Sequence, residues 1–209
     1  MKKFLTFLMA LMLLSNIASA DYTISLDSTQ TVYSNELTFD EPGTPTGAID
    51  PTSFSMLGIL ELQAGDGVPQ VNDHSGFGPW LGTDNSFFGN FGVFLTFEDD
   101  VTDFNVNIQD PSGPPSPFGG GAIAFVFDDG VEVTNFAFTP AWGGVGDEWL
   151  NINATGGMVF DEVRILGFGF GPTTFADDLS WNAASAIPEP ASASLVLLFA
   201  GIAAVRRRR

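Results

Sequence analysis

Acidic side chains occur in six doublets, and these are the residues of the chain best suited to bind a cation. The doublets are Asp40-Glu41, Asp99-Asp100, Asp128-Asp129, Asp147-Glu148, Asp161-Glu162 and Asp177-Asp178. Calcium takes six to eight oxygen ligands from clustered carboxylates and carbonyls. No EF-hand loop is present, and the run 143–147 matches only half of a calcium-binding glycine repeat. We therefore interpret the first five doublets as solvated residues at turns.

Asp177 stands apart from these turn residues. Strict alternation places it on the same side of a strand as Phe175, Leu179 and Trp181, which is the side expected to face the core. A buried carboxylate needs a partner. Calcium and backbone N–H groups are the candidates, because Arg164 is the only basic residue in the body of the chain. Asp177 and Asp178 are thus a candidate calcium site, with hydrogen bonding without a metal as the alternative.

Catalytic arrangements find little support in the sequence. His74 is the only histidine and there is no cysteine, so a zinc site is not indicated. Ser75 follows His74 but lacks the G-x-S-x-G turn of a nucleophilic serine. Paired carboxylates could hydrolyse a glycoside, yet nothing in the sequence locates such a pair among 25 acidic residues. No catalytic residue is predicted.

Aromatic residues in glycine-rich segments are the candidates for binding a glycan. The C–H faces of sugars stack on flat rings, whose faces carry partial negative charge. Trp80 lies in a long segment with Phe87 and Phe88, and Trp142 follows Pro140-Ala141. The alternative is that these rings close the ends of the fold. Trp80 and Trp142 are the predicted glycan-binding residues.

The charge of the chain excludes several classes of partner. All 25 acidic residues lie between Asp21 and Glu189, where Arg164 is the only basic residue, so this body carries a net charge of −24. Nucleic acid and anionic membrane surfaces are therefore not expected as partners. Divalent cations and neutral glycans remain compatible with this charge. Without cysteine, the body must be stabilised by its core or by bound metal.

Short alternating segments predict an all-β fold for residues 21–186. Phe104, Val106 and Ile108 alternate with Asn105 and Asn107, which predicts a strand with one buried and one exposed face. Asp128-Asp129-Gly130 predicts a hairpin turn, and a parity change predicts a bulge near Asn135. Strands are also expected within 31–39 and 53–62, and a long loop over 65–90. Some nine strands without helices favour an antiparallel β-sandwich of jelly-roll type.

Both ends of the chain have the pattern of targeting segments. Residues 1–20 carry Lys2 and Lys3, an apolar stretch, and Ala18-Ser19-Ala20, which predicts a signal peptide cleaved before Asp21. Residues 187–209 contain Pro188-Glu189-Pro190, an uncharged run over 191–205 expected to form a membrane helix, and the cluster Arg206, Arg207, Arg208 and Arg209. Arginines beside an apolar run stay cytoplasmic. A plain C-terminal anchor is one interpretation of this tail.

The tail resembles the PEP-CTERM sorting signal of Gram-negative bacteria, also called the ice-binding-protein C-terminal domain. The resemblance implies an exosortase that cleaves near Pro-Glu-Pro, a transient inner-membrane intermediate, and release to the cell surface or the exopolysaccharide matrix. Ice binding itself is not indicated, because regular Thr-x-Thr arrays are missing. The body resembles the jelly rolls of such proteins, in segments including 94–97, 128–131 and 175–179. Some carbohydrate-binding jelly rolls take structural calcium from a similar Asp-Asp last strand.

Together these features predict an exported surface or matrix protein with a structural or glycan-interaction role. It is not expected to be an enzyme. A calcium-dependent carbohydrate-binding module is the first alternative, and a secreted glycan hydrolase is the second. Extracellular polysaccharide and the sorting enzyme are the expected partners.

Overall fold

A computed structural model describes residues 21–73, 85–109, 121–139, 149–168 and 173–184. These residues form twelve strands and one short 3₁₀ helix, η1 (Ser55–Leu57). All strand pairs are antiparallel. No helix among the described residues is long and apolar enough to span a membrane. The expected all-β sandwich is confirmed, while the expected signal and membrane helices lie outside the described residues.

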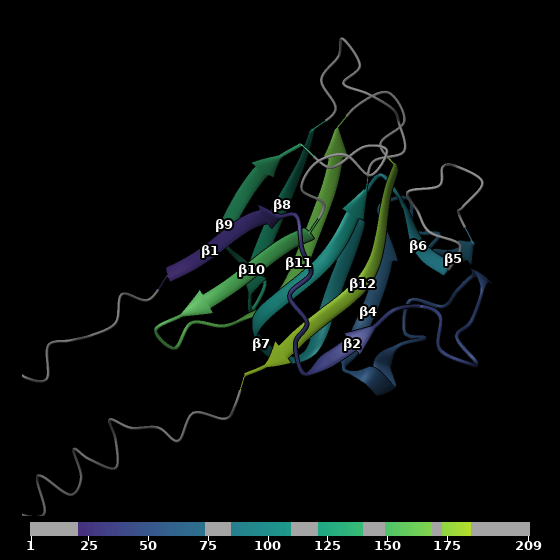
Figure 1. Cartoon of the computed structure of the whole chain (residues 1–209), viewed down its shortest axis with the longest axis horizontal. Coiled ribbons are helices and arrows are strands. Elements are labelled where there is room, and N and C mark those ends of the chain that lie inside the picture. The colour runs from purple at the N-terminus through teal and green to yellow at the C-terminus, as the bar shows by residue number, and fades with distance from the viewer. Residues whose placement is uncertain (1–20, 74–84, 110–120, 140–148, 169–172, 185–209) are drawn as a thin grey trace, which may run out of the picture.

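Seven strands and part of an eighth form one layer, which we call sheet A. Its order is β1 (Asp21–Asp27), β10 (Trp149–Thr155), the second half of β7 (Val93–Gln109), and β12 (Thr173–Ala183). The far edge of β12 pairs with β6 (Asn85–Asn90) and with β2 (Asn35–Leu37). Beyond β6 lie β5 (Gln70–Asp73) and β3 (Gly47–Ala48). Figure 1 shows this layer toward the viewer.

The second layer, sheet B, consists of β4 (Ile59–Ala64), the first half of β7, β11 (Phe160–Phe168), β8 (Gly121–Asp128) and β9 (Val131–Phe138). At 17 residues, β7 is long enough to contribute to both layers. Its residues 93–97 pair with β4 and β11, and its residues 103–107 pair with β10. This shared strand fixes the position of the two sheets relative to each other.

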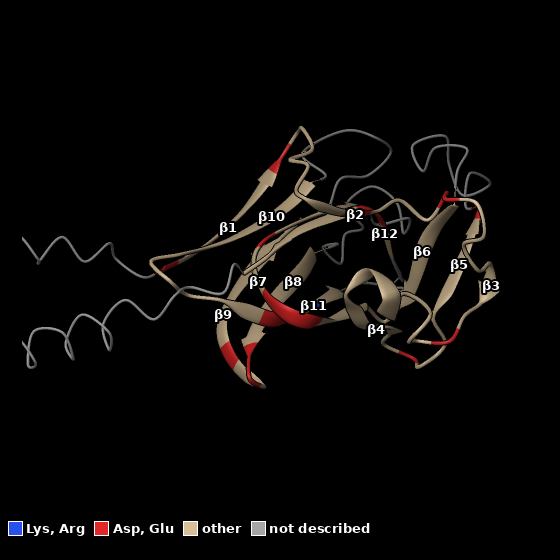
Figure 2. Cartoon of the chain, turned by 90° about the horizontal axis from the view of Figure 1, so that it is seen from below, with Lys and Arg blue, Asp and Glu red and all other residues tan. Residues whose placement is uncertain are grey.

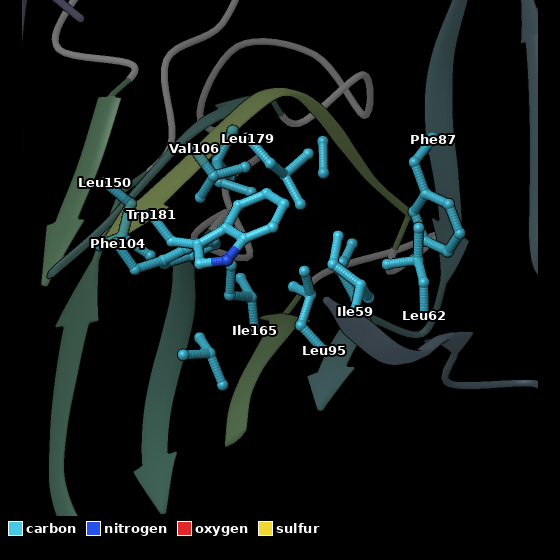
Figure 3. Packing of buried hydrophobic residues seen from close by; sticks show 14 of the residues in the cluster. Ile59, Leu62, Phe87, Leu95, Phe104, Val106, Leu150, Ile165, Leu179 and Trp181 are labelled. Atoms are coloured by element: carbon cyan, nitrogen blue, oxygen red, sulfur yellow. The ribbon is translucent and has the colours of Figure 1, made fainter. Parts of the chain in front are cut away.

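The core lies between the inner faces of the two sheets. Figure 3 shows Leu150, Phe104 and Val106 of sheet A facing Ile165, Leu95 and Ile59 of sheet B, with the Trp181 ring between them. Phe97 packs at 5.7 Å edge-to-face on Phe104 and at 5.8 Å on Trp181, measured between ring centroids. Phe104, Val106 and Ile108 are each 0% exposed, which confirms the predicted inner face of this strand. Burial of such rings and branched chains is the main driving force for folding.

Local geometry confirms the predicted hairpin between β8 and β9. Asp129 and Gly130 have φ angles of +50° and +74°, the pair of left-handed residues that a type I′ turn requires. The register between the two strands shifts between Val126 and Phe127, opposite residues 132–134 of β9. The predicted bulge is therefore present, slightly before Asn135. It lets Phe136 and Phe138 turn to the core side after the hairpin.

Three predicted segments differ from the structure. Only residues 35–37 of the segment 31–39 form a strand, and the segment 53–62 begins with η1 before β4 starts at Ile59. The expected long loop over 65–90 instead contains β5 and β6, which pair with each other. These strands are rich in glycine, aspartate and asparagine, which have low strand propensity, so propensity does not predict them. Pairing with neighbouring strands stabilises them instead.

Candidate functional site

The outer side of sheet B carries a cluster of apolar side chains that we call the aromatic face. Its members share one side of β7, β8 and β11 and are half-buried: Phe94, Ile123, Phe125, Phe127 and Leu166. None of the five belongs to the core or to the partly buried residues packed against it. Rings on the water side of a sheet have no role in filling the core, so this face is the leading candidate for contact with a ligand.

Strand register sets the arrangement of this face. Phe94 on β7, Arg164 on β11 and Phe125 on β8 lie directly opposite one another in neighbouring strands. Gln63 on β4 and Asn135 on β9 extend the same row at its two ends. Neighbouring strands are about 4.8 Å apart, so the backbones carrying the two phenylalanines are separated by about 9.6 Å. Phe127, two residues along β8, lies about 7 Å from Phe125 on the same side.

Arg164 lies at the centre of the aromatic face. Its guanidinium carbon is 4.6 Å from the centroid of the Phe127 ring and 5.9 Å from that of Phe94. Its Nε donates a hydrogen bond to Glu162, which also forms an ion pair with it. The arginine side chain is 45% exposed, so it can meet a ligand from solvent. Cation–π contact and the ion pair together hold a planar set of N–H donors among flat rings.

The polar surroundings of the aromatic face are acidic. The next row of the sheet carries Glu61, Thr96, Glu162, Phe127 and Glu132 on the same side. Asn135 Nδ2 donates to Glu132 at 2.7 Å. The Oε1 atom of Gln63 is buried and accepts no hydrogen bond among the described residues. The face therefore offers uncharged polar groups at both ends of the aromatic row and negative charge alongside it.

The outer side of sheet A is polar, and the segment 28–34, which we call the strap, crosses it (Figure 1). Ser180 donates to the carbonyl of Thr31 at 3.0 Å, and Asn153 donates to the Tyr33 hydroxyl at 2.9 Å. The Ser34 N–H and hydroxyl both donate to Asn182 Oδ1. These hydrogen bonds fasten the strap to β10 and β12. The strap therefore acts as a cover for the polar side of sheet A.

Side chains beneath the strap bond mainly to one another. Asn105 Nδ2 donates to Asn151 Oδ1 at 2.6 Å, and Asn151 in turn donates to Asp27. Asn153 and Asn182 both donate to the Asp103 carboxylate, at 2.9 and 3.0 Å. This bonding pairs most of these polar groups without a ligand, as buried polar groups require, although Asn105 Oδ1 accepts no hydrogen bond among the described residues. It is a structural network, and the aromatic face stays the stronger candidate site.

One predicted exposure is therefore wrong. Asn105 was expected to face solvent, but it is 0% exposed, and Asn107 is half-buried. Alternation placed both correctly on the outer side of β7. The strap and the neighbouring strands then remove this outer side from water, which a periodicity within one strand does not reveal.

Asp100, Asp128, Asp129 and Asp161 interact electrostatically, and acidic residues gather at the end of sheet B that carries the β8–β9 turn (Figure 2). Burial raises the pKa of Asp161, and the charges of Asp128, Asp129 and Asp100 raise it further. Burial also raises the pKa of Asp128, and the charges of Asp129 and Asp100 raise it further. Asp161 lies within β11, and Asp99 and Asp100 lie within β7, so the interpretation of these two doublets as turn residues is wrong. Among the described residues, no group of three or more His, Cys, Asp or Glu is arranged to hold a metal ion.

The structure places Asp177 on the outer side of sheet A. Asp177 lies opposite Asn107, while Ala176 lies opposite the buried Ile108. The register shifts between Asp177 and Ser180, and Asp178 has a φ of +47°. This β-bulge adds one residue, so Leu179 and Trp181 face the core while the half-buried Asp177 does not. The expectation that Asp177 points into the core is wrong, and calcium binding by Asp177 and Asp178 stays a prediction.

Several predicted site residues lie outside the described residues. They are Ala18 and Ala20 of the signal peptide, Trp80, Trp142, and the sorting residues 188–190 and 206–209; His74, for which no role was predicted, lies outside them too. The aromatic face was not predicted as a site. Its signal was present in the alternation of Ile123, Phe125 and Phe127 with the small residues Ala122 and Ala124. Large residues on one parity suggest the core side, but here the small residues face inward and the rings face out.

Comparisons with known proteins place the chain in no family. The sequence matches no protein-family model, and no curated protein matches it significantly. Among solved structures, it is similar to a family 6 carbohydrate-binding module whose binding subsites were studied by crystallography and isothermal titration calorimetry. The TM-score is 0.35 and the identity 10%, over 60% of this chain and 88% of the other. A likeness of this size carries no inference about ligand or function.

Proposed function

We propose that this protein is an exported, non-catalytic β-sandwich that binds a glycan through the aromatic face of sheet B. The observation that carries the proposal is the set of rings Phe94, Phe125 and Phe127 around the exposed Arg164, on the side of the sheet away from the core. Flat aromatic rings stack on the C–H faces of sugars. Arg164, Gln63 and Asn135 supply the hydrogen-bonding groups that fix the orientation of a sugar ring.

Glycan-array binding by the protein isolated from its producing cells tests this role. Phe125→Ala should abolish or strongly weaken the binding of any glycan that the unchanged protein retains. Phe91→Ala is the matched control, because Phe91 is 52% exposed at the β6–β7 turn and is not part of the aromatic face. Binding that survives Phe125→Ala as well as it survives Phe91→Ala would place the glycan site elsewhere and contradict the proposal.

We further propose that the tail 187–209 delivers the protein to the cell surface or exopolysaccharide matrix. Support comes from the sequence pattern alone: Pro188-Glu189-Pro190, the uncharged run and the four arginines. Glu189→Gln or deletion of residues 206–209 should leave unprocessed protein in the inner membrane. Mass spectrometry of the surface fraction gives the measurement. A C-terminus that still ends at Arg209 there would favour the plain anchor.

Calcium-dependent glycan binding is the second candidate. Asp177-Asp178 forms a bulge beside Asn107 on the outer side of sheet A, which gathers oxygen-bearing side chains at one point of the sheet. If this candidate were correct, glycan binding would be lost on removal of calcium and would be insensitive to Phe125→Ala. The same array, repeated with a chelator, therefore separates the two candidates.

A further inference from the structure

The aromatic face has a geometry and a charge that restrict which glycans it can bind, provided that the proposed glycan-binding function holds. Phe94 and Phe125 are separated by two strand spacings, with Arg164 between them. The row of five side chains crosses five strands, from Gln63 on β4 to Asn135 on β9. A ligand that contacts the whole row must lie across the strands as an extended chain.

The separation of the strands that carry Phe94 and Phe125 suits a flat ribbon. Two strand spacings, about 9.6 Å, correspond to the length of two pyranose units joined through equatorial bonds. In β-linked chains of this kind the successive rings lie nearly in one plane and expose C–H groups on both faces. α-Linked chains curl into helices. If one sugar of such a chain stacks on Phe94, the following sugars turn away from the sheet and do not reach Phe125. The spacing therefore favours a β-linked ribbon.

The charges on the face favour a neutral ligand. Arg164 is the only cationic side chain on it, and the ion pair with Glu162 offsets its charge. Glu61 and Glu132 lie in the row beside the rings and are exposed. An anionic sugar would meet more negative than positive charge there, and like charges brought together disfavour binding. The whole body, at −24, adds to this repulsion.

We propose that the aromatic face binds an uncharged, β-linked glycan ribbon lying across β7, β11 and β8, with sugar rings stacked on Phe94 and Phe125. Arg164 lies under the linkage between the stacked sugars and donates hydrogen bonds to their hydroxyl groups. The Phe127 ring packs against the Arg164 guanidinium, whose carbon lies 4.6 Å from the ring centroid. The Gln63 and Asn135 side chains bound the site at its two ends.

Isothermal titration calorimetry with three oligosaccharides of equal length tests this assignment. Cellohexaose is the neutral β-linked ribbon, maltohexaose the neutral α-linked chain, and hexagalacturonate the anionic chain. We expect cellohexaose to bind more tightly than the other two by at least about tenfold, with little dependence on salt concentration. Phe94→Ala and Phe125→Ala should each weaken cellohexaose binding by about tenfold or more, while Phe91→Ala should not.

The outcomes separate this assignment from the function on which it rests. Maltohexaose or hexagalacturonate could instead bind as tightly as cellohexaose or more tightly, and lose this binding in Phe125→Ala. That result would overturn the proposed ligand class but not glycan binding at this face. Loss in Phe125→Ala without loss in Phe94→Ala would overturn the orientation across the strands. Absence of binding to all three sugars and to a glycan array would overturn both proposals. Circular dichroism of each variant would confirm that the sandwich is intact.

Discussion

Ile108 shows how a single buried side chain supports the sandwich. It is 0% exposed on the inner side of β7, opposite Ala176. Ile108→Ala removes buried methyl groups and leaves a cavity, so we expect a loss of about 2–5 kcal/mol in the free energy of unfolding. Denaturant titration measures this loss. Val131→Ala, at a side chain that is 65% exposed, is the control and should change stability by no more than about 0.5 kcal/mol.

Asp161 gives a prediction about pH. Burial and three neighbouring carboxylates raise its pKa in the folded chain above the ordinary value of 3.8. A raised pKa means that ionisation of Asp161 opposes folding, so its destabilising effect is full above the folded pKa and absent below pH 3.8. We therefore expect Asp161→Asn to raise the melting temperature at pH 7. The gain should shrink as the pH falls through the folded pKa.

Asp66 provides the opposite case and serves as the control for Asp161. Hydrogen bonds from the Asn90 side chain and the Val68 N–H lower the pKa of Asp66. A lowered pKa stabilises the fold above the ordinary value, and this contribution is lost as the pH falls through the folded pKa. Asp66→Asn should therefore lower the melting temperature at pH 7. If both variants shifted stability in the same direction at pH 7, the electrostatic account of Asp161 would fail.

At the scale of elements, the β6–β7 turn, which connects sheet A to sheet B, packs closely against β11. Phe91 and Gly92 have φ angles of +63° and +134°, and the Gly92 carbonyl accepts from the Gly65 N–H at 3.1 Å. A Cβ added at Gly92 would lie 2.6 Å from the carbonyl oxygen of Ile165 on β11. Close backbone approach thus requires glycine here, in addition to the positive φ.

Substitution of Gly92 separates these two requirements. Gly92→Ala should cost roughly 1–3 kcal/mol more than Gly43→Ala, because overpacking adds to the backbone strain. Gly43 also has a positive φ, +98°, but an added Cβ would meet nothing within 4 Å. Thermal unfolding of both variants measures the difference. Equal losses of stability in the two variants would mean that the close contact between residue 92 and β11 adds nothing to the cost of the substitution.

At the scale of the whole molecule, the charge of −24 on residues 21–189 makes stability sensitive to cations. A cation that binds only the folded state adds about 2.7 kcal/mol at a hundredfold excess over Kd. If Asp177 is a ligand, calcium should raise the melting temperature beyond sodium at matched ionic strength, and Asp177→Asn should remove most of that rise. Asp128→Asn, at the β8–β9 turn, should leave it.

Two results would decide against calcium at Asp177. Equal calcium-specific shifts in the unchanged protein and in Asp177→Asn would exclude this residue as a ligand. Loss of the shift in Asp128→Asn instead would place the cation among Asp100, Asp128, Asp129 and Asp161, at the end of sheet B that carries the β8–β9 turn.

The fold class and most of the strands around the core could be predicted from the sequence. Phe104, Val106 and Ile108 are buried as predicted, and Asp128-Asp129-Gly130 forms the hairpin turn. These features depend on interactions between residues close in the chain: alternation within a strand, and the left-handed preference of Asp-Gly turns. Local rules of this kind are readable without knowledge of the fold.

Which side of β8 and of the first part of β12 faces the core, and how far the outer side of β7 is exposed, could not be predicted from the sequence. The bulge at Asp178 reverses the parity that had placed Asp177 in the core, and the strap buries Asn105 on an outer face. Phe125 and Phe127 face outward, while Ala122, Ala124 and Val126 form the buried inner side of β8. Alternation gives two faces, but contacts between residues distant in sequence select the inner one, and that selection created the aromatic face.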